Sequence, residues 1–486
     1  MDFFDYFAAV AEKFPERPAA ELQRKQDVER LTYREMADLS SRAASWLDEH
    51  GIGAGERVAL LAENDGVWCG AYLGVLRAGA VAVPLDTNYT DTQISKLLKD
   101  CDGSAVFTSE RFADLARAAL REYREMPIAV MRTDFEGLPA APRRRSTRPE
   151  DPAVILYTSG TTADPKGVVL THANIVAERS AAFQVVKVDD RDVILSVLPL
   201  FHALAQMANL LLPFSVGARV VFLESINTTE LARALRERGI TAFVCVPQFF
   251  YLLHQRIEHE IAALPFPVRA FVRSAAWLNL RLRTVLGVNP GRLMFRRIHH
   301  ALGPRLRILI TGGARFDPGI NRSLFALGFS IQQAYGLTEC SGGATVTRTG
   351  DPHFASVGQP LPGVDVRIAP SKGEDGEILI RGGIIMKGYY KRPDLNATTL
   401  ADGWLHTGDL GYRDRGGRLY ITGRSKEIIV LGSGKNIYPE EIEAHYEKSA
   451  FIQELCVVGL SRPGEPTSER LHALVRPDAE AMRARG

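Results

Sequence analysis

Short apolar runs alternate with amphipathic stretches along the first 149 residues, and this pattern predicts strands separated by helices. Apolar residues recur at helical spacing over residues 32–50, directly before Gly51. Further strands are expected at 56–64, 80–86 and 104–109, with helices at 66–80 and 91–102. Strands that alternate with helices favour a parallel sheet with crossover helices.

The alternation resumes after residues 141–152, whose prolines and clustered arginines predict an exposed linker. The next expected elements are a helix at 173–184 and strands at 192–202, 218–224, 241–247 and 305–311. From Asp351 onward, short strands and glycine turns predict a small, mainly antiparallel unit. Its strands are expected at 364–370, 376–382 and 417–423.

Together these patterns predict an α/β protein with a large N-terminal domain over residues 1–423. Within it we expect two αβ-layered parallel-sheet parts, 1–149 and 150–350, and a small β-barrel-like subdomain at 351–423. Residues 424–486 have the pattern of a small, separate α+β domain. The second αβ part is expected to carry most of the binding chemistry.

Residues 156–172, LYTSGTTADPKGVVLTH, set hydroxyl residues, a glycine and a lysine between two apolar runs. Small residues let backbone N–H groups approach an anion, and the hydroxyls and the lysine ammonium add further donors. A phosphate-binding loop between two strands is predicted, distinct from a Walker loop because no Ser or Thr follows the lysine. The alternative is a flexible surface loop. The candidate residues are Thr158, Ser159, Gly160, Thr161, Thr162 and Lys166.

Composition narrows the class of protein. A chain of 486 residues with net charge +2 is too long for one ordinary domain and is not a globally basic nucleic-acid binder. Its five cysteines lack C-x-x-C pairing, which indicates reduced thiols and no zinc site. The N-terminus lacks a secretory pattern and no apolar segment is long enough to span a bilayer, so a cytoplasmic location is expected.

Three later blocks carry candidate nucleotide chemistry. In YGLTE, an aromatic ring is followed by a hydroxyl and by the carboxylate of Glu339, which could hold Mg²⁺ together with water and substrate oxygens. In WLHTGDL, Asp409 could accept hydrogen bonds from ribose hydroxyls. Taken alone, each block also fits an ordinary turn. The candidate residues are Gly312, Gly313, Ala314, Tyr335, Gly336, Thr338, Glu339, Asp409 and Arg424.

With the phosphate loop, these blocks resemble, in order and separation, the adenylate-forming superfamily of acyl-CoA synthetases, peptide-synthetase adenylation domains and luciferases. The resemblance spans nearly the whole chain. It implies that a carboxylate attacks the α-phosphorus of ATP, that pyrophosphate leaves, and that a thiol then attacks the acyl-adenylate. Because both partners in the first step are anions, catalysis would depend on positioning and cationic stabilisation.

The resemblance also implies a role for each candidate residue. The loop from Thr158 to Lys166 would hold the β- and γ-phosphates of ATP. The remaining implied roles are adenine binding by Gly312, Gly313, Ala314 and Tyr335, α-phosphate contact by Thr338, Mg²⁺ binding by Glu339, and ribose binding by Asp409 and Arg424. Lys426 would be the hinge about which the C-terminal domain swings between the two half-reactions.

One part of the family's pattern is absent from this chain. The family carries a lysine in a Gly-Lys-Ile-like context that reaches the carboxylate and the α-phosphate. After Lys426 only Lys435 and Lys448 follow, neither in that context. We therefore expect a truncated C-terminal domain and a crippled adenylation step. Thioester formation is expected to survive, because GSGKN at 432–436, which the resemblance puts beside the pantetheine tunnel, is present.

Residues 198–212 would line the acyl pocket, and no Asp, Lys or Arg lies between Val193 and Ala218. Amino-acid substrates are therefore disfavoured, because their ammonium needs a buried acid partner.

His202 is either structural or, by the resemblance, borders the acyl carboxylate and gates the pocket. The leading hypothesis is a fatty acid–CoA ligase that prefers long chains. The alternatives are an enzyme that loads an acyl carrier protein and a catalytically dead acyl-nucleotide-binding protein.

Residues 261–316 contain ten arginines and no acidic residue, interleaved with Phe271, Trp277, Leu278 and Met294. The stretch resembles the helical insertion of long-chain fatty acyl-CoA synthetases. A basic amphipathic segment can rest on an anionic lipid surface, so peripheral membrane contact is one interpretation. The other interpretation is a solvated helix pair that faces acidic residues elsewhere in the fold.

Overall fold

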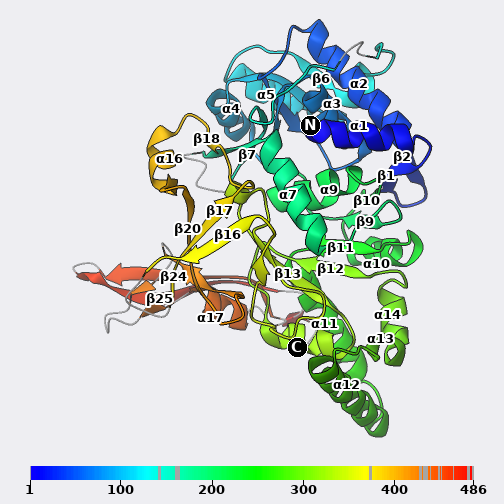
Figure 1. The fold of residues 1–486 in the computed structure, drawn as a ribbon, viewed down its shortest axis with the longest axis vertical. Coiled ribbons are helices and arrows are strands. Elements are labelled where there is room, and N and C mark those ends of the chain that lie inside the picture. The colour runs from blue at the N-terminus through cyan, green and yellow to red at the C-terminus, as the bar shows by residue number, and fades with distance from the viewer. Residues whose placement is uncertain are drawn as a thin grey trace.

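The computed structural model describes most of the 486-residue chain. The described residues are 2–140, 144–158, 165–370, 375–425, 429–430, 436–437, 439–446, 449, 451–462, 465–478 and 482–483. Figure 1 shows two bodies of helices and sheet along the long axis of the molecule, with the antiparallel unit and the C-terminal segment beside them. The predicted α/β class is confirmed.

The larger sheet has nine strands within the described residues. Its central strands, from β13 to β1, run parallel, and antiparallel strands complete both edges. In spatial order the strands are β15 (Gln359–Pro360), β14 (Thr345–Val346), β13 (Ile331–Tyr335), β12 (Ile308–Thr311), β11 (Ala242–Cys245), β9 (Val193–Ser196), β10 (Arg219–Leu223), β1 (Pro18–Gln23) and β2 (Val28–Thr32). The expected strand at 192–202 ends early, since Pro199 cannot donate to a ladder in a central strand.

The second sheet has seven strands in the described part of the chain. In spatial order they are β18 (Gly388–Tyr389), β8 (Gly167–Thr171), β7 (Pro152–Tyr157), β4 (Val81–Pro84), β3 (Arg57–Leu61), β5 (Gly103–Thr108) and β6 (Ile128–Val130). The expected division at residue 149 does not separate the two sheets. β1 and β2 pair within the larger sheet, whereas β7 pairs with β4 in the second. A local sequence pattern identifies a strand but not the strand with which it pairs. The placement of β1 and β2 in the larger sheet, and of β7 in the second, therefore has no signal in the sequence.

The expected helix at 32–50 is confirmed as α2 (Tyr33–Glu49). It begins with a capping box, in which the Thr32 hydroxyl accepts from the Glu35 N–H and the Glu35 carboxylate accepts from the Thr32 N–H. Its buried face packs on α3 (Gly66–Arg77), which is buried along almost its whole length. A Cβ at Gly70 would lie 2.4 Å from Leu39 Cδ2, and one at Gly74 would lie 2.5 Å from Ala43 Cβ. The glycines therefore allow the two helices to approach closely.

Further helices lie around the sheets, and α12 lies at one end of the molecule (Figure 1). They are α1 (Phe3–Lys13), α4 (Asp91–Asp100), α5 (Ala113–Arg121), α6 (Met131–Asp134), α7 (His172–Val185), α8 (Ala203–Gln206), α9 (Leu212–Phe214), α10 (Thr228–Glu237), α11 (Pro247–Ala262), α12 (Phe266–Leu286), α13 (Gly291–Met294), α14 (Arg296–Leu302), α15 (Pro318–Ala326) and α16 (Pro393–Thr399). Short 3₁₀ turns lie at η1 (Glu110–Phe112) and η3 (Thr338–Cys340), and a π-helical turn lies at η2 (Met207–Leu211). None of the described helices combines the length and apolar character needed to cross a bilayer.

The unit expected after Asp351 is an antiparallel sheet that packs into the same core as α1, α2 and α3. Its strands are β16 (Val364–Ile368), β17 (Gly376–Gly382), β20 (Trp404–Arg413), β19 (Leu400–Ala401) and β21 (Leu419–Arg424). The C-terminal segment is α+β as expected. It comprises β22 (Ile429–Val430), β23 (Asn436–Ile437), α17 (Pro439–Tyr446), β24 (Ile452–Arg462) and β25 (Glu465–Pro477).

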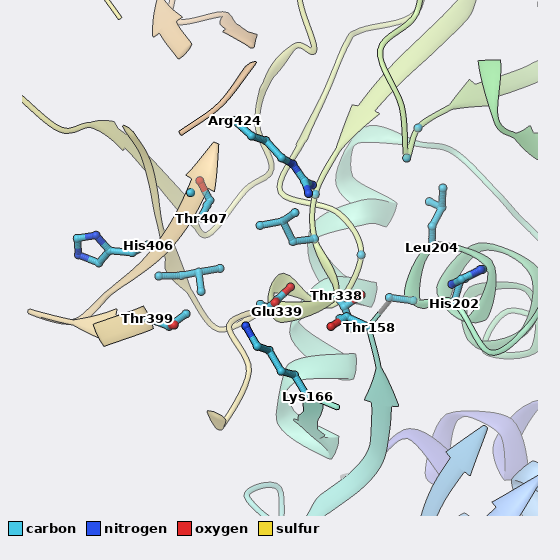
Figure 2. Close-up of a pocket in the computed structure, with 18 of the residues that line it drawn as sticks. Thr158, Lys166, His202, Leu204, Thr338, Glu339, Thr399, His406, Thr407 and Arg424 are labelled. Carbon is cyan, nitrogen blue, oxygen red and sulfur yellow. The ribbon is translucent and has the colours of Figure 1, made fainter. Parts of the chain in front are cut away.

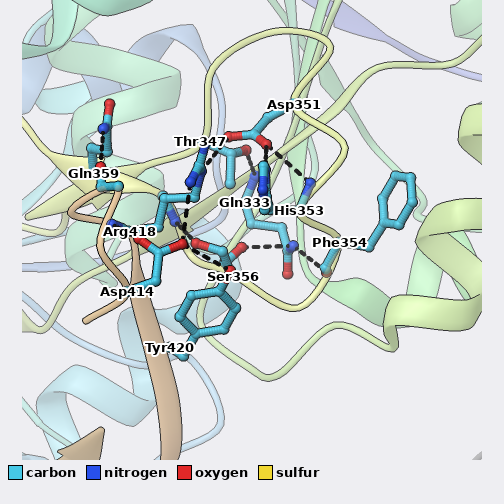
Figure 3. A network of polar contacts seen from close by, with 12 residues as sticks. Gln333, Thr347, Asp351, His353, Phe354, Ser356, Gln359, Asp414, Arg418 and Tyr420 are labelled. Atoms are coloured by element: carbon cyan, nitrogen blue, oxygen red, sulfur yellow. Dashed lines mark hydrogen bonds and ion pairs between the residues drawn. The ribbon is translucent and has the colours of Figure 1, made fainter. Parts of the chain in front are cut away.

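A polar network joins the larger sheet to the antiparallel unit (Figure 3). Gln333 in β13 donates from its amide to the carbonyls of Phe354 and Ser356, at 2.8 and 2.9 Å. The Ser356 hydroxyl in turn donates to the Leu419 carbonyl at the start of β21. Gln333 and Ser356 are buried, so these bonds pair polar groups in the interior, and they hold the two sheets together.

We predict that Gln333→Ala destabilises the protein by about 1–3 kcal/mol, because it leaves two carbonyl acceptors without their donor. The measurement is the urea midpoint followed by circular dichroism. Gln359→Ala is the matched control, since Gln359 donates to the Gly416 carbonyl at an exposed position and its loss should change the midpoint little. Equal midpoints for the two variants would contradict a structural role for the network.

Candidate active site

A cavity of about 900 Å³ opens at the carboxyl ends of strands from both sheets. Thr158 directly follows β7, Val246 follows β11, Gly312 follows β12 and Gly336 follows β13, and all four line this cavity. Parallel strands end at the same edge of a sheet, which is where open α/β sheets bind their ligands. The antiparallel unit closes the cavity with residues of β20 and β21, among them Arg424.

Two cationic side chains reach the cavity from different elements. Lys166 lies just before β8, and its Nζ is 5.9 Å from the centre of the Tyr389 ring. Arg424 ends β21 and extends toward the centre of the cavity, while Lys166 and Glu339 lie below it (Figure 2). The Thr158 N–H donates to the Lys166 carbonyl at 3.4 Å, so the two ends of the predicted phosphate loop meet here. This region of the cavity suits an anion.

Glu339 lies in η3, and its carboxylate is held by one tyrosine. The Tyr389 hydroxyl donates to Glu339 Oε1 at 2.7 Å, and the Met386 N–H donates to the Glu339 carbonyl at 2.9 Å. Burial, and secondarily the charge of Glu339, raise the pKa of Tyr389, so its hydroxyl stays protonated as a donor.

Among the described residues no cluster of three or more His, Cys, Asp or Glu could hold a metal ion. Any ion here would depend on Glu339 and on ligand oxygens, a donor set that fits Mg²⁺.

Asp409 in β20 links three elements beside the cavity. It accepts from the Tyr335 hydroxyl at 2.7 Å through Oδ2, and its Oδ1 lies 3.0 Å from Arg424 Nε. Asp409 is 3% exposed, whereas half of the Arg424 side chain reaches solvent. Burial is the main cause, and the Asp409 carboxylate a further one, of a raised pKa at Tyr335. The contacts fix Asp409 between the larger sheet and the antiparallel unit.

His202 follows β9 and lies with Leu204 on the far side of the cavity from His406 (Figure 2). Its ring packs on Phe201 at 4.3 Å between centroids. Desolvation lowers the pKa of His202, so the ring facing the cavity is neutral at pH 7. A smaller apolar cavity of about 100 Å³ adjoins this side, since Leu204, Ala334 and Gly342 line both.

The structure brings many of the predicted residues together around the large cavity. Those that line it are Thr158, Lys166, His202, Gly312, Gly313, Gly336, Thr338, Glu339 and Arg424. Tyr335 and Asp409 lie next to it and contact each other, whereas Ala314 is exposed and is not part of its wall. Ser159, Gly160, Thr161, Thr162, Lys426 and residues 432–435 lie outside the described residues.

Several lining residues were not predicted. Tyr389, Glu377 and His406 all line the cavity, and the His406 ring nitrogen Nδ1 lies 3.0 Å from Glu377 Oε2. Thr399 and Thr407 lie on the same side (Figure 2). Tyr389 reaches the site because β18 pairs with β8, more than 200 residues earlier. No local pattern signals such a pairing.

Fold and cavity together define an α/β protein with a cleft at the carboxyl ends of its strands, lined by the cationic side chains of Lys166 and Arg424. The chain belongs to the AMP-binding enzyme family, whose sequence profile matches residues 7–390.

Relatives and solved structures agree with this assignment. The chain is 32% identical to the long-chain-fatty-acid–CoA ligase FadD15 of Mycobacterium bovis, over 93% of this chain and 78% of the relative. It is 30% identical to FadD13, also named a long-chain-fatty-acid–CoA ligase, of Mycobacterium tuberculosis, over 92% and 84%. Among solved structures, a Mycobacterium tuberculosis fatty acyl CoA synthetase superposes with a TM-score of 0.75 and 26% identity, covering 100% of this chain and 92% of that one.

Proposed function

We propose that this chain is an ATP-dependent fatty acid–CoA ligase with a preference for long chains. It would convert acid and ATP to acyl-adenylate and pyrophosphate, and then acyl-adenylate and CoA to acyl-CoA and AMP. The main supporting observation is that Lys166, Glu339 and Arg424 line one cavity whose other side adjoins an apolar cavity. The names of the relatives, long-chain-fatty-acid–CoA ligases, support the same substrates.

In this proposal, Lys166 and the loop after Thr158 hold the β- and γ-phosphates of ATP. Thr338 contacts the α-phosphate, and Glu339 holds Mg²⁺, which would neutralise phosphate charge. Gly312 and Gly313, with Tyr335 next to them, frame the adenine, whereas Ala314 does not line the cavity. Asp409, which Tyr335 orients, accepts from the ribose hydroxyls.

The attacking carboxylate would lie near His202, on the apolar side. Because this ring is neutral, it places no positive charge beside the acyl chain. The acyl carboxylate and ATP, which react in the first step, are both anions. Lys166 and Arg424 would therefore lower the barrier chiefly by electrostatic stabilisation. The hinge role of Lys426 remains a prediction from the resemblance.

The two half-reactions can be tested separately. We expect preformed acyl-adenylates of different chain lengths, mixed with CoA, to give acyl-CoA most rapidly at long chains, followed by mass spectrometry. ATP–pyrophosphate exchange with the same acids measures the adenylation half-reaction separately.

Other outcomes identify the alternatives. Transfer of the acyl group to a phosphopantetheinylated carrier protein but not to CoA would make the chain a carrier-loading enzyme. Tight binding of the adenylate without transfer to either thiol would indicate a catalytically dead binding protein.

Lys166→Met should weaken ATP binding roughly 10- to 100-fold, because hydrogen bonds to charged groups contribute about 1.5–3 kcal/mol. AMP binding should change little, since AMP lacks the β- and γ-phosphates. Isothermal titration with each nucleotide and Mg²⁺ measures both affinities. Lys387→Met is the control, because the Lys387 ammonium contacts the Glu150 carbonyl and does not line the cavity. Equal losses for ATP and AMP would contradict the assignment.

We further propose that α12 contacts an anionic lipid surface. The helix is inverted in polarity: its buried residues are Asn279 and Arg283, while Phe271, Trp277 and Val285 are each more than half exposed. Asn279 and Arg283 anchor the helix through the carbonyls of residues 325, 326 and 329. Figure 1 shows α12 at one end of the molecule. An apolar outer face flanked by exposed arginines matches an anionic interface.

The double substitution Phe271→Ser/Trp277→Ser should reduce binding to phosphatidylglycerol vesicles about tenfold or more in a flotation assay. Binding to phosphatidylcholine vesicles should be weak for both proteins, because they offer no negative charge to the arginines. Tyr412→Ser/Leu474→Ser, which removes exposed apolar residues outside α12, is the control. Unchanged flotation of the α12 variant would contradict this contact.

A further inference from the structure

The small cavity beside the active site is apolar except at two residues. Its walls come from the larger sheet, from α7 and from residues 207–213. Thr345 is one polar lining residue, and its hydroxyl already donates to the Val357 carbonyl at 2.7 Å. Glu178 is the other. A carboxyl group in an apolar wall requires an explanation, because burying it without partners is costly.

Glu178 lies in α7 and is 5% exposed. Its Oε2 is buried and has no hydrogen-bond partner among the described residues. Burial raises the pKa of Glu178 well above its ordinary value, because the charged form loses its hydration, and this favours the neutral carboxylic acid. A neutral carboxylic acid can both donate and accept a hydrogen bond.

The backbone opposite Glu178 leaves room for this carboxyl. A Cβ at Gly343 would lie 2.7 Å from Glu178 Oε1, which is closer than atoms can approach. A glycine at this position therefore allows the acid to occupy the cavity wall. Other buried polar groups without partners, such as those of His172 and Asn209, do not line this cavity.

We infer that Glu178 is a specificity residue that hydrogen-bonds a hydroxyl group on the acyl chain. The inference rests on the proposed ligase function, because the cavity adjoins the site where the acyl carboxylate would react. A hydroxyl both donates and accepts, which matches a neutral carboxyl. A site built to bond a substrate hydroxyl discriminates against the analogue that lacks it, because its own polar group is then left unpaired.

The volume of the cavity limits which part of the chain it can hold. At about 100 Å³ it is smaller than an engineered apolar cavity of about 150 Å³ that binds benzene. Only a short stretch of chain fits, so the hydroxyl must lie on that stretch. Positional isomers of a hydroxyacyl chain, compared in a binding experiment, identify the carbon that carries this hydroxyl.

The test measures binding of non-reactive acyl-sulfamoyl-adenosine analogues, so that it does not depend on turnover. The probes carry decanoyl and the positional hydroxydecanoyl isomers, titrated by calorimetry against the wild-type protein, Glu178→Gln, Glu178→Leu and Thr345→Val. We expect at least one hydroxy isomer to bind the wild-type protein about tenfold or more tightly than decanoyl. Glu178→Leu should lose or reverse this preference, and Glu178→Gln should keep part of it, since an amide also donates and accepts.

The outcomes separate the inference from the proposed function. If no analogue binds, the ligase proposal itself fails. If all analogues bind the wild-type protein with no preference for any hydroxy isomer, the inference is overturned while the ligase proposal stands. A preference that Thr345→Val abolishes and Glu178→Gln leaves intact would also overturn it. Because Gln is nearly isosteric with Glu, Glu178→Gln keeps the test valid if the leucine variant does not fold.

Discussion

The close contact of α3 with its neighbours is the constraint on which the arrangement of the two sheets depends. α3 packs on α2 where Gly70 and Gly74 leave no space for a Cβ, and it also touches β1 of the larger sheet and β3 and β4 of the second. One helix therefore contacts both sheets and belongs to the core they share. Because interiors pack at nearly crystalline density, a shift of α3 would displace both sheets together. The cavity needs this alignment, since β7 and β13 come from different sheets.

Asp409 links the antiparallel unit to this frame at the site itself. Its carboxylate contacts Tyr335, at the end of β13, and Arg424, at the end of β21. The Gln333 network joins β13 to the same unit through buried bonds. β13 thus carries cavity residues at its end and holds the antiparallel unit along its length. Polar groups next to the cavity therefore hold the sheet that closes it.

Much of this could be predicted from the sequence wherever the cause is local. The apolar residues at helical spacing over 32–50 and the short apolar runs identified helices and strands, and residues directly after strands line the cavity where the parallel order places them. The features that could not be predicted depend on strands that pair although they lie far apart in the sequence. β1 joins β10, and β18 brings Tyr389 to β8, although neither pairing has a local signal. β9 is shorter than its apolar run, because Pro199 has no N–H to donate to a ladder.

Two buried polar groups show why a missing partner is informative. Arg283 is buried in α12, and burial lowers its pKa to about 10, yet the guanidinium donates to two carbonyls and the Ser330 hydroxyl. Its polar groups are paired within the protein, so no ligand is needed to explain its burial. Glu178 is also buried, but its Oε2 is unpaired and the residue lines a cavity next to the active site. The fold itself pairs the buried guanidinium of Arg283, whereas for Glu178 the proposed partner is a hydroxyl group of the bound acyl chain.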